Sequence, residues 1–189
     1  MKKIAVFASG TGTNFDAIAD AIEQGKLNTE ITLVVVDKLQ APVIKKAKKR
    51  GIEVFAFNPK DYSCKAEYEK AIIEQCHSHN VDFIVLAGYM RLLAEDLLSA
   101  YDQKIVNIHP ALLPAFKGKD AIGQAIEYGV KVMGVTIHYV DASMDGGKII
   151  AQRSFDVDPA WDHDEIEAHV HAIEHVLYPE TLKVLLEEH

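Results

Sequence analysis

Short apolar runs alternate along this chain with segments of helical periodicity. Five of the runs have the length of strands, at residues 3–7, 31–36, 52–57, 82–87 and 104–108. Each run is continuously apolar, which is typical of strands whose two faces are both covered by helices. The alternation of strands and helices therefore predicts an α/β protein built on a parallel sheet.

The pattern changes in the last third of the chain. The strand-like segments 135–141 and 148–157 are separated by only six residues, which favours an antiparallel pair. Helical periodicity over 162–188 predicts a long C-terminal helix, which Pro179 should kink or break. We therefore expect a doubly wound, mostly parallel open sheet (Rossmann-like) with an antiparallel C-terminal addition, in one domain spanning 1–189.

Local signals also place a helix after the second strand. Pro42 fits a first-turn position, residues 45–50 bring positive charge to the helix end, and Gly51 suits the left-handed residue that follows it. These bases are expected to form a solvated face that complements the helix dipole, and not a binding patch.

Charge and composition limit the class of partner. The chain has 189 residues, with 20 Lys and Arg against 28 Asp and Glu and a net charge of −8; ten of these acids and one base lie in 155–189. Nucleic-acid binding requires clustered positive charge, so we expect no nucleic-acid partner. No apolar stretch approaches the roughly 18 residues of a membrane span, so no membrane association is expected.

The two cysteines and the start of the chain indicate the compartment. Cys64 and Cys76 have no C-x-x-C partner, and no apolar signal region follows Met1. A reduced, cytoplasmic protein is therefore expected.

The first candidate site is the segment Ser-Gly-Thr-Gly-Thr-Asn at 9–14, between the first strand and the helix that follows. Its glycines allow a tight turn, and the free N–H groups of a helix start attract anions. It matches neither the Walker A sequence nor the dinucleotide fingerprint, so a small phosphate or phosphoribose suits it better. The alternative is a plain turn capped by Ser or Thr.

The second candidate is the pair Asn107 and His109, at the end of the fifth strand. Ligands bind at the carboxyl ends of strands in open α/β sheets, where residues two apart face the same crevice. Asn can donate to a developing oxyanion, and His can move a proton. The alternative is a histidine that only satisfies backbone groups in a proline-rigid loop.

The third candidate is the loop 141–147. Its paired glycines allow a close approach of ligand or a positive-φ turn, and either Asp141 or Asp145 could orient a histidine and keep it charged. The alternative is that these acids only favour the turn. His138, on the preceding strand, is a weaker candidate that could equally point outward or pair with a neighbouring strand.

Two other kinds of chemistry lack support. The pairs His77 and His79, and His169 and His171, do not have the spacing of a zinc site, so no metal is expected. There is no G-x-S-x-G motif and no cysteine at a predicted strand end, so covalent nucleophilic catalysis is not expected.

The combination of these segments resembles the folate-dependent formyltransferase superfamily. The sequence N-x-H-P-x-L-L-P at 107–114 is typical of the superfamily. The sequence S-G-x-G-T-N at 9–14 is similar to the corresponding segment of its glycinamide ribonucleotide branch and of the related formyltetrahydrofolate hydrolases. Segments 85–93, 134–152 and 172–179 extend the resemblance over nearly the whole chain.

This resemblance implies a reaction and its partners. The formyl group of 10-formyltetrahydrofolate, a co-substrate, would pass to the amine of 5′-phosphoribosylglycinamide, giving 5′-phosphoribosyl-N-formylglycinamide and tetrahydrofolate in de novo purine biosynthesis. The implied partners are these small molecules, with no metal, no nucleic acid and no membrane, in a monomer or homodimer. The implied catalytic trio is Asn107, His109 and Asp145.

The resemblance also implies which residues bind each substrate. The N-terminal half would bind the ribonucleotide, and the C-terminal half would carry folate binding and catalysis. Lys65 stands where other members carry Arg, and a lysine cannot form the forked contact that Arg makes with a carboxylate. The implied ribonucleotide residues are Gly12, Thr13, Asn14, Phe15 and Glu174. The implied folate residues are Lys65, Met90, Arg91, Leu92, Leu93, Asn107, Asp141, Ala142, Ser143, Met144 and Asp145.

Three alternatives compete with this interpretation. Formyltetrahydrofolate hydrolases usually carry an extra N-terminal domain, for which 189 residues leave no room. Methionyl-tRNA formyltransferases normally add a tRNA-binding domain and need a basic surface, whereas this C-terminal region is acidic. A noncatalytic nucleotide-binding module would need the 9–14 loop but not the trio.

Overall fold

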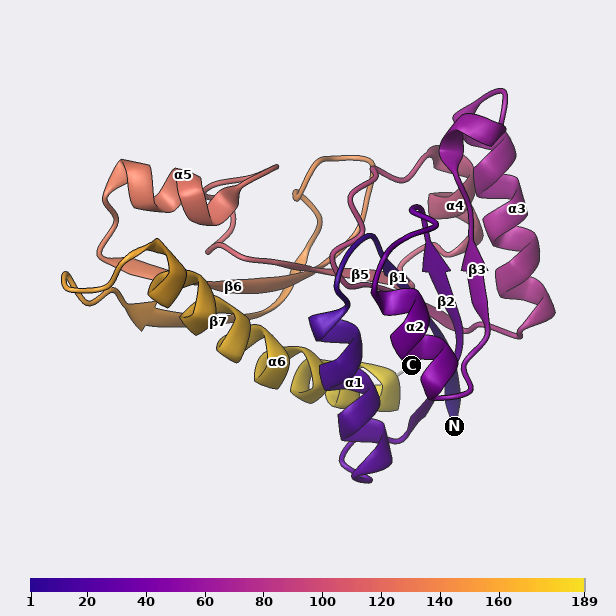
Figure 1. The fold of residues 1–189 in the computed structure, drawn as a ribbon, viewed down its shortest axis with the longest axis horizontal. Helices are drawn as coiled ribbons and strands as arrows, with labels where there is room; N and C mark the ends of the chain where they lie inside the picture. Colours follow the sequence, from indigo (N-terminus) through magenta and orange to yellow (C-terminus); the bar gives the residue numbers. More distant parts are fainter. Residues whose placement is uncertain (189) are drawn as a thin grey trace.

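The structure, a computed structural model, describes residues 1–188 as one sheet flanked by helices (Figure 1). In chain order the elements are β1 (Lys2–Ala8), α1 (Thr13–Glu23), β2 (Thr29–Val36), α2 (Val43–Lys49), β3 (Val54–Ala56), the 3₁₀ turn η1 (Pro59–Asp61), α3 (Lys65–Ser78), β4 (Phe83–Leu86), α4 (Glu95–Ala100), β5 (Ile105–His109), α5 (Ala121–Tyr128), β6 (Val132–Tyr139), β7 (Ile149–Asp156) and α6 (His163–Glu188).

The seven strands form a single mixed sheet. Their order is β3-β2-β1-β4-β5-β6-β7. The first five strands of the chain pair in parallel, whereas β6 is antiparallel to both β5 and β7. The predicted fold class is therefore confirmed, including the antiparallel C-terminal addition.

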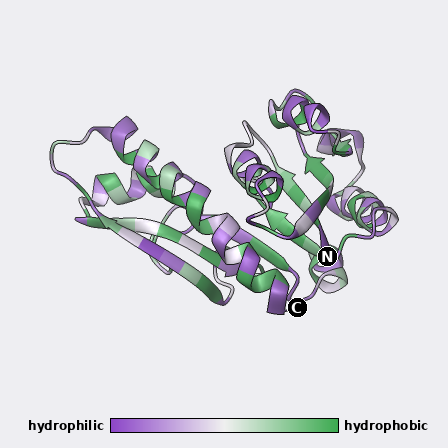
Figure 2. Cartoon of the chain, turned by 90° about the horizontal axis from the view of Figure 1, so that it is seen from below, coloured by the Kyte–Doolittle hydropathy of each residue, from purple (hydrophilic) through white to green (hydrophobic). Residues whose placement is uncertain are grey.

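Helices cover both faces of the sheet and enclose two hydrophobic cores. One core joins the sheet to α1, α2, α5 and α6, and includes the fully buried Phe15, Val43 and Val170. The other joins the opposite face to α3 and α4 through Ile72 and Leu97. Figure 2 shows the parallel strands as largely hydrophobic, whereas the antiparallel edge strand β7 has hydrophilic stretches. Burial on both faces explains why the parallel strands are continuously apolar in sequence.

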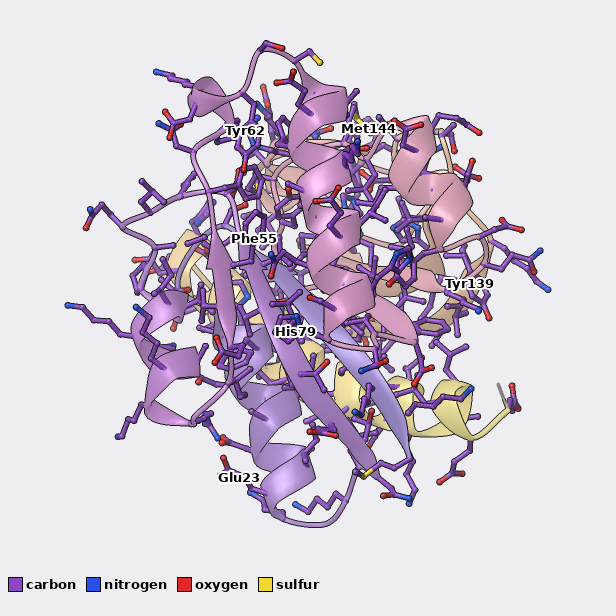
Figure 3. The ribbon with its side chains drawn as sticks, turned by 90° about the vertical axis from the view of Figure 1, so that its right-hand side faces the viewer. Glu23, Phe55, Tyr62, His79, Tyr139 and Met144 are labelled. Atoms are coloured by element: carbon purple, nitrogen blue, oxygen red, sulfur yellow. The ribbon has the colours of Figure 1, made fainter. Side chains whose placement is uncertain are left out.

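The direction of chain winding reverses at β1. The chain first builds outward through β2 and β3, then crosses to the other side of β1 to form β4. The loops that leave β1 and β4 meet there, since Ser9 N donates to Gly88 O at 3.2 Å and Met90 N donates to Ser9 Oγ at 2.9 Å. Such a switch point opens a crevice at the carboxyl ends of the strands. In Figure 3, Met144 and Tyr62 lie at this end and Glu23 at the opposite end.

Helix α6 runs through Pro179 without interruption, so of the two effects predicted for this proline, a kink or a break, the break is wrong. Packing around the proline explains the difference, because Tyr178 and Leu182 are fully buried. Tyr178 Oη also donates to Leu86 O at 2.8 Å and lies 3.3 Å from Val106 O. Tertiary contacts thus offset the backbone hydrogen bond that a proline removes.

No helix within residues 1–188 is both long and apolar enough to cross a membrane.

A helix follows the second strand as predicted, but Pro42 precedes its first turn, and two of the neighbouring bases are not simply solvated. Pro42 is the N-cap, and Gly51 has a φ of 71°. Lys46 Nζ lies 2.5 Å from Asp16 Oδ2, and Arg50 forms ion pairs with acids on α1, including Asp20 at 2.6 Å. These pairs join α2 to α1.

Candidate active site

A cleft of about 810 Å³ lies at the carboxyl ends of the parallel strands. Most of the residues predicted from sequence line it. Its walls are formed by 9–14, 86–93, 107–110, 118–122 and 140–145, together with Lys38, His138, His163, Glu167, His171 and Glu174. The three candidate segments of the sequence therefore meet in one cavity.

The start of α1 forms one end of this cleft. Gly12 is its N-cap with a φ of 74°, and no side chain caps the helix. The N–H groups of the first turn therefore have no side-chain acceptor, which differs from the capped turn considered as the alternative. A Cβ atom at Gly12 would lie 2.5 Å from Val43 Cγ2, so glycine is required by both conformation and space. The unpaired backbone N–H groups at the start of α1, together with the helix dipole, are therefore suited to bind an anion.

Asn107, His109 and Asp145 come together at the end of β5. His109 Nδ1 lies 3.5 Å from Asp145 Oδ2. The same carboxylate oxygen accepts a hydrogen bond from Gly118 N at 2.8 Å. Asp145 has a φ of 49°, in the left-handed region that non-glycine residues rarely occupy. Its carboxylate is thus held against the histidine by a constrained loop.

The hydrogen bonds of His109 fix its tautomer. Its Nε2 lies 2.8 Å from Phe116 O, and a carbonyl oxygen can only accept, so Nε2 carries a proton. The remaining nitrogen, Nδ1, faces Asp145 and is the position that gains or loses a proton. This histidine is 5% exposed, and its exposed part lines the cleft.

His138 is more closely involved than its weak sequence signal indicated. It pairs with Asn107 across the antiparallel strands, and its Nε2 lies 3.2 Å from Asn107 Nδ2. His138 Nδ1 faces Tyr139 O at 2.8 Å and must be the donor there. Burial lowers the pKa of His138, which favours the neutral ring. Neutral Nε2 then accepts from the Asn107 amide and fixes which way that amide points.

The two acids of the loop 141–147 have different partners. Asp141 accepts hydrogen bonds from Ser143 Oγ and from Ser143 N at 2.8 Å, and these bonds lower the pKa of Asp141. Asp145, in contrast, faces His109 and also lies 3.7 Å from His138 Nε2. A Cβ at Gly147 would lie 1.8 Å from Tyr139 O. Glycine at this position therefore allows the loop backbone to pass close to the backbone of Tyr139. Of the two acids, Asp145 is therefore the one that faces the histidines at the end of β5.

Apolar side chains line another part of the cleft. Met90, Leu92 and Met144 line it and are respectively 58%, 60% and 50% exposed. Large apolar side chains with this exposure are typical of a binding surface. Beside them, Arg91 Nε donates to Asp37 Oδ2 at 2.8 Å, and Asp37 is buried. The combination suits a flat ring with a polar edge.

Phe15 and Lys65 do not line the cleft within residues 1–188. The Phe15 side chain is buried in the core, although its backbone N–H belongs to the first turn of α1. Lys65 Nζ lies 3.9 Å from Glu69 Oε1, which also accepts from Ala94 N at 2.8 Å. Lys65 is therefore close to the end of the 90–93 segment, outside the cleft.

Glu174 and its neighbours lie beside the start of α1. Glu174 is 4% exposed, and its Oε2 is 3.2 Å from Asn14 Nδ2 and 2.9 Å from His171 Nδ1. Glu174 was predicted from the resemblance, but His171 was not. The i, i+3 spacing of the two residues on one helix was the signal available for it.

One exposed group could hold a cation. His163, Asp164 and Glu167, at the start of α6, have ligand atoms within 4.8 Å of one another, and they are the one such group within residues 1–188. Exposed acids are common without a metal, and the absence of a metal from this protein stays a prediction.

Comparison with known proteins identifies the family of this chain. The model of the formyl transferase family matches residues 2–182. The chain is 52% identical over 186 residues to the phosphoribosylglycinamide formyltransferase of Bacillus subtilis, covering 98% of this chain and 95% of that protein.

Solved structures show the same likeness. Glycinamide ribonucleotide transformylase 1 from Geobacillus kaustophilus superposes with a TM-score of 0.96 at 52% identity, covering 98% of this chain and 99% of that one. Phosphoribosylglycinamide formyltransferase from Bacillus halodurans also gives 0.96, at 48% identity, covering 98% and 95%. The chain belongs to the formyl transferase family.

Proposed function

We propose that this protein transfers the formyl group of 10-formyltetrahydrofolate to the amine of 5′-phosphoribosylglycinamide. Formyl transferases take their formyl group from a folate-derived donor. The acceptor is the one in the names of the relatives from Bacillus subtilis and Haemophilus influenzae. The products would be tetrahydrofolate and 5′-phosphoribosyl-N-formylglycinamide, an intermediate of purine biosynthesis.

One observation carries the proposal. A single cleft holds the group of Asn107, His109 and Asp145 and also the uncapped start of α1. The three side chains can stabilise a carbonyl oxyanion and transfer a proton, and the start of α1 can bind a phosphate. A phosphorylated amine acceptor and a formyl donor require both functions within reach of each other.

Transfer begins when the substrate amine attacks the formyl carbon. A new C–N bond forms, and the π electrons of the carbonyl move to its oxygen, giving a tetrahedral oxyanion. The Asn107 amide has two N–H bonds, and one is directed to His138 Nε2 at 3.2 Å. The other can donate to the oxyanion. The second donor would be Nδ1–H of protonated His109, because Nε2–H is already donated to Phe116 O.

Collapse of the intermediate requires a proton transfer. The attacking amine loses a proton, the leaving N10 nitrogen gains one, and the bond between N10 and the formyl carbon breaks. Asp145 faces His109 Nδ1 at 3.5 Å, a distance at which it can orient that ring and stabilise its charged form. No covalent enzyme intermediate and no metal are needed for these steps.

The substrates would occupy opposite parts of the cleft. The phosphate would bind N–H groups of Gly12, Thr13, Asn14 and Phe15, with Glu174 on the ribose hydroxyls. The pteridine ring would lie against the 90–93 segment and the 141–145 loop, with Lys65 near the charged tail. The N-terminal half would thus supply most of the ribonucleotide subsite, and the C-terminal half would supply the trio. Small-molecule substrates of this kind fit a cytoplasmic enzyme that is a monomer or a homodimer.

The proposal is tested by following tetrahydrofolate release by absorbance. We expect release from 10-formyltetrahydrofolate only when phosphoribosylglycinamide is present, with formation of the N-formyl product. Equal release in water alone would indicate a hydrolase. No release under either condition would contradict both activities.

A further inference from the structure

Glu174 is a nearly buried carboxylate with an uneven set of partners. Both of its hydrogen bonds fall on one oxygen, Oε2, which faces Asn14 Nδ2 at 3.2 Å and His171 Nδ1 at 2.9 Å. Among residues 1–188 no group donates to the other oxygen, Oε1. Because Glu174 lines the cleft, this arrangement orients the carboxylate and leaves one oxygen for a ligand.

His171, when protonated, compensates the charge of this buried carboxylate. It is the one basic group within residues 1–188 that forms an ion pair with Glu174. Its other nitrogen, Nε2, lies 3.4 Å from Glu167 Oε1, so the charged ring has a carboxylate on each side. The hydrogen bond to Glu174 is the main reason that the pKa of His171 is raised, and Glu167 adds to it. A buried carboxylate without such a partner would be strongly destabilised.

We propose that His171 is a positioning residue, which holds the Glu174 carboxylate so that its free oxygen accepts hydrogen bonds from the ribose hydroxyls of the ribonucleotide. This inference rests on the proposed function. His171 acts through Glu174 and does not take part in formyl transfer, so its loss affects binding of one substrate and leaves the chemical step intact.

Other titratable groups lie near this pair. His175 lies one turn further along α6, and burial lowers its pKa. Its ring also interacts electrostatically with Glu174, with Asp16 of α1 and with Lys46 of α2. The pKa of His171 is raised mainly by Glu174 and then by Glu167, and the charged forms of His171 and His175 repel each other. The raised pKa of His171 means that its charged form persists to higher pH than an ordinary histidine, and is lost as the pH rises further.

The test compares His171→Leu, His171→Gln and the wild type. Leu removes the hydrogen bond to Glu174, whereas Gln keeps an N–H donor but cannot titrate. We expect His171→Leu to raise the KM for phosphoribosylglycinamide about tenfold, as for one lost hydrogen bond to a charged group. The kcat and the KM for 10-formyltetrahydrofolate should not change. Gln should restore most of the binding.

Two further readouts distinguish positioning from general damage. As the pH rises through and above neutrality, the KM of the wild type should rise relative to that of His171→Gln, because only the wild type loses a charge. The wild type should also bind phosphoribosylglycinamide more tightly than its 2′-deoxyribose analogue, and His171→Leu should lose most of that preference.

The matched control is His169→Leu on the same helix. His169 faces Trp161, with ring centroids 4.3 Å apart, and does not line the cleft. It should leave the KM for the ribonucleotide unchanged. If the wild type formylates phosphoribosylglycinamide but His171→Leu has an unaltered KM, or if the two His171 variants share one pH profile with the wild type, this inference is wrong. If the wild type does not formylate that substrate at all, the proposed function itself fails.

Discussion

Asp145 combines an uncommon backbone conformation with three polar neighbours. Its φ is 49°, and its carboxylate faces His109, His138 and the Gly118 N–H. A left-handed non-glycine residue typically costs on the order of 1–3 kcal/mol, so the surrounding contacts must hold it in place. The strain is therefore located at a group for which we propose a catalytic role.

Replacing Asp145 with Asn tests that role at almost constant shape. The amide oxygen can still accept from Gly118 N, but the negative charge facing His109 Nδ1 is lost. We expect kcat to fall on the order of a hundredfold or more, the usual contribution of a positioned acid–base group. The measurement is the absorbance assay at saturating concentrations of both substrates.

Asp141→Asn is the companion to that variant. Asp141 is satisfied by Ser143 within its own turn, so its replacement should reduce kcat much less. An Asp141→Asn enzyme as impaired as Asp145→Asn, or an Asp145→Asn enzyme with normal turnover, would remove Asp145 from the mechanism.

The sequence indicated some of these residues and left others undecided. Asn107 and His109 could be predicted because they end an apolar strand, where ligand sites form. Asp141 and Asp145 could not be told apart, since they differ in their contacts: Asp145 faces His109 and accepts from Gly118 N, whereas Asp141 accepts from Ser143. Contacts of this kind join segments through the tertiary structure, and local pattern does not contain them.

His138 was uncertain for a related reason. Its contact with Asn107 follows from the register between β5 and β6. A shift of one residue in that register would turn the histidine to the other face of the sheet, and the sequence does not specify the register.

At the scale of elements, the start of α1 depends on its contact with α2. We predict that Gly12→Ala weakens phosphoribosylglycinamide binding, because the new Cβ would lie 2.5 Å from Val43 Cγ2 and displace the turn. The variant should also lose about 1–3 kcal/mol of unfolding free energy from overpacking, in addition to the roughly 1–2 kcal/mol of a left-handed alanine. Its KM and its urea denaturation curve measure the two effects.

Gly25→Ala separates backbone strain from close packing. Gly25 has a similar φ of 69° but nothing within 4 Å of an added Cβ. It should lose only the roughly 1–2 kcal/mol expected for a left-handed alanine and keep a normal KM. An equal KM increase in both variants would argue against an anion site at α1.

The contact of α6 with the sheet gives a second prediction at this scale. Tyr178 is fully buried, and its Oη lies 2.8 Å from Leu86 O and 3.3 Å from Val106 O. Tyr178→Phe leaves these carbonyl groups without that donor, so the unfolding free energy should fall by about 1–3 kcal/mol. Tyr128→Phe, at an 81% exposed position, should change it by less than about 0.5 kcal/mol. Similar values for the two variants would show that the Tyr178 hydroxyl does not secure α6.

The same contact shows the limit of prediction for α6. Its existence followed from the spacing of apolar residues, but its continuity through Pro179 depends on packing against β4 and β5. Proline has a strong local effect on helices, and only the tertiary structure shows that buried neighbours override it here.

At the scale of the whole molecule, one cleft brings together parts of the chain from Ser9 to Glu174. The parallel sheet explains this, since the ends of its strands meet at one edge and the winding reverses at β1. The cleft has an uncapped helix start in one part and exposed apolar side chains in another. The two substrates we propose should therefore respond independently to changes in the two parts.

Leu92→Asp tests this independence without disturbing the core. Leu92 is 60% exposed and lines the apolar part of the cleft, so a carboxylate there should oppose binding of an apolar ring system and leave folding intact. We expect the KM for 10-formyltetrahydrofolate to rise about tenfold or more, since one buried apolar contact of this size is worth about 1.5–3 kcal/mol. The KM for phosphoribosylglycinamide should stay near that of the wild type. Leu39→Asp is the control, at a 52% exposed leucine that does not line the cleft, and should leave both KM values unchanged. Equal increases for the two substrates in Leu92→Asp would mean that the cleft responds as one unit, and that the folate subsite is misplaced.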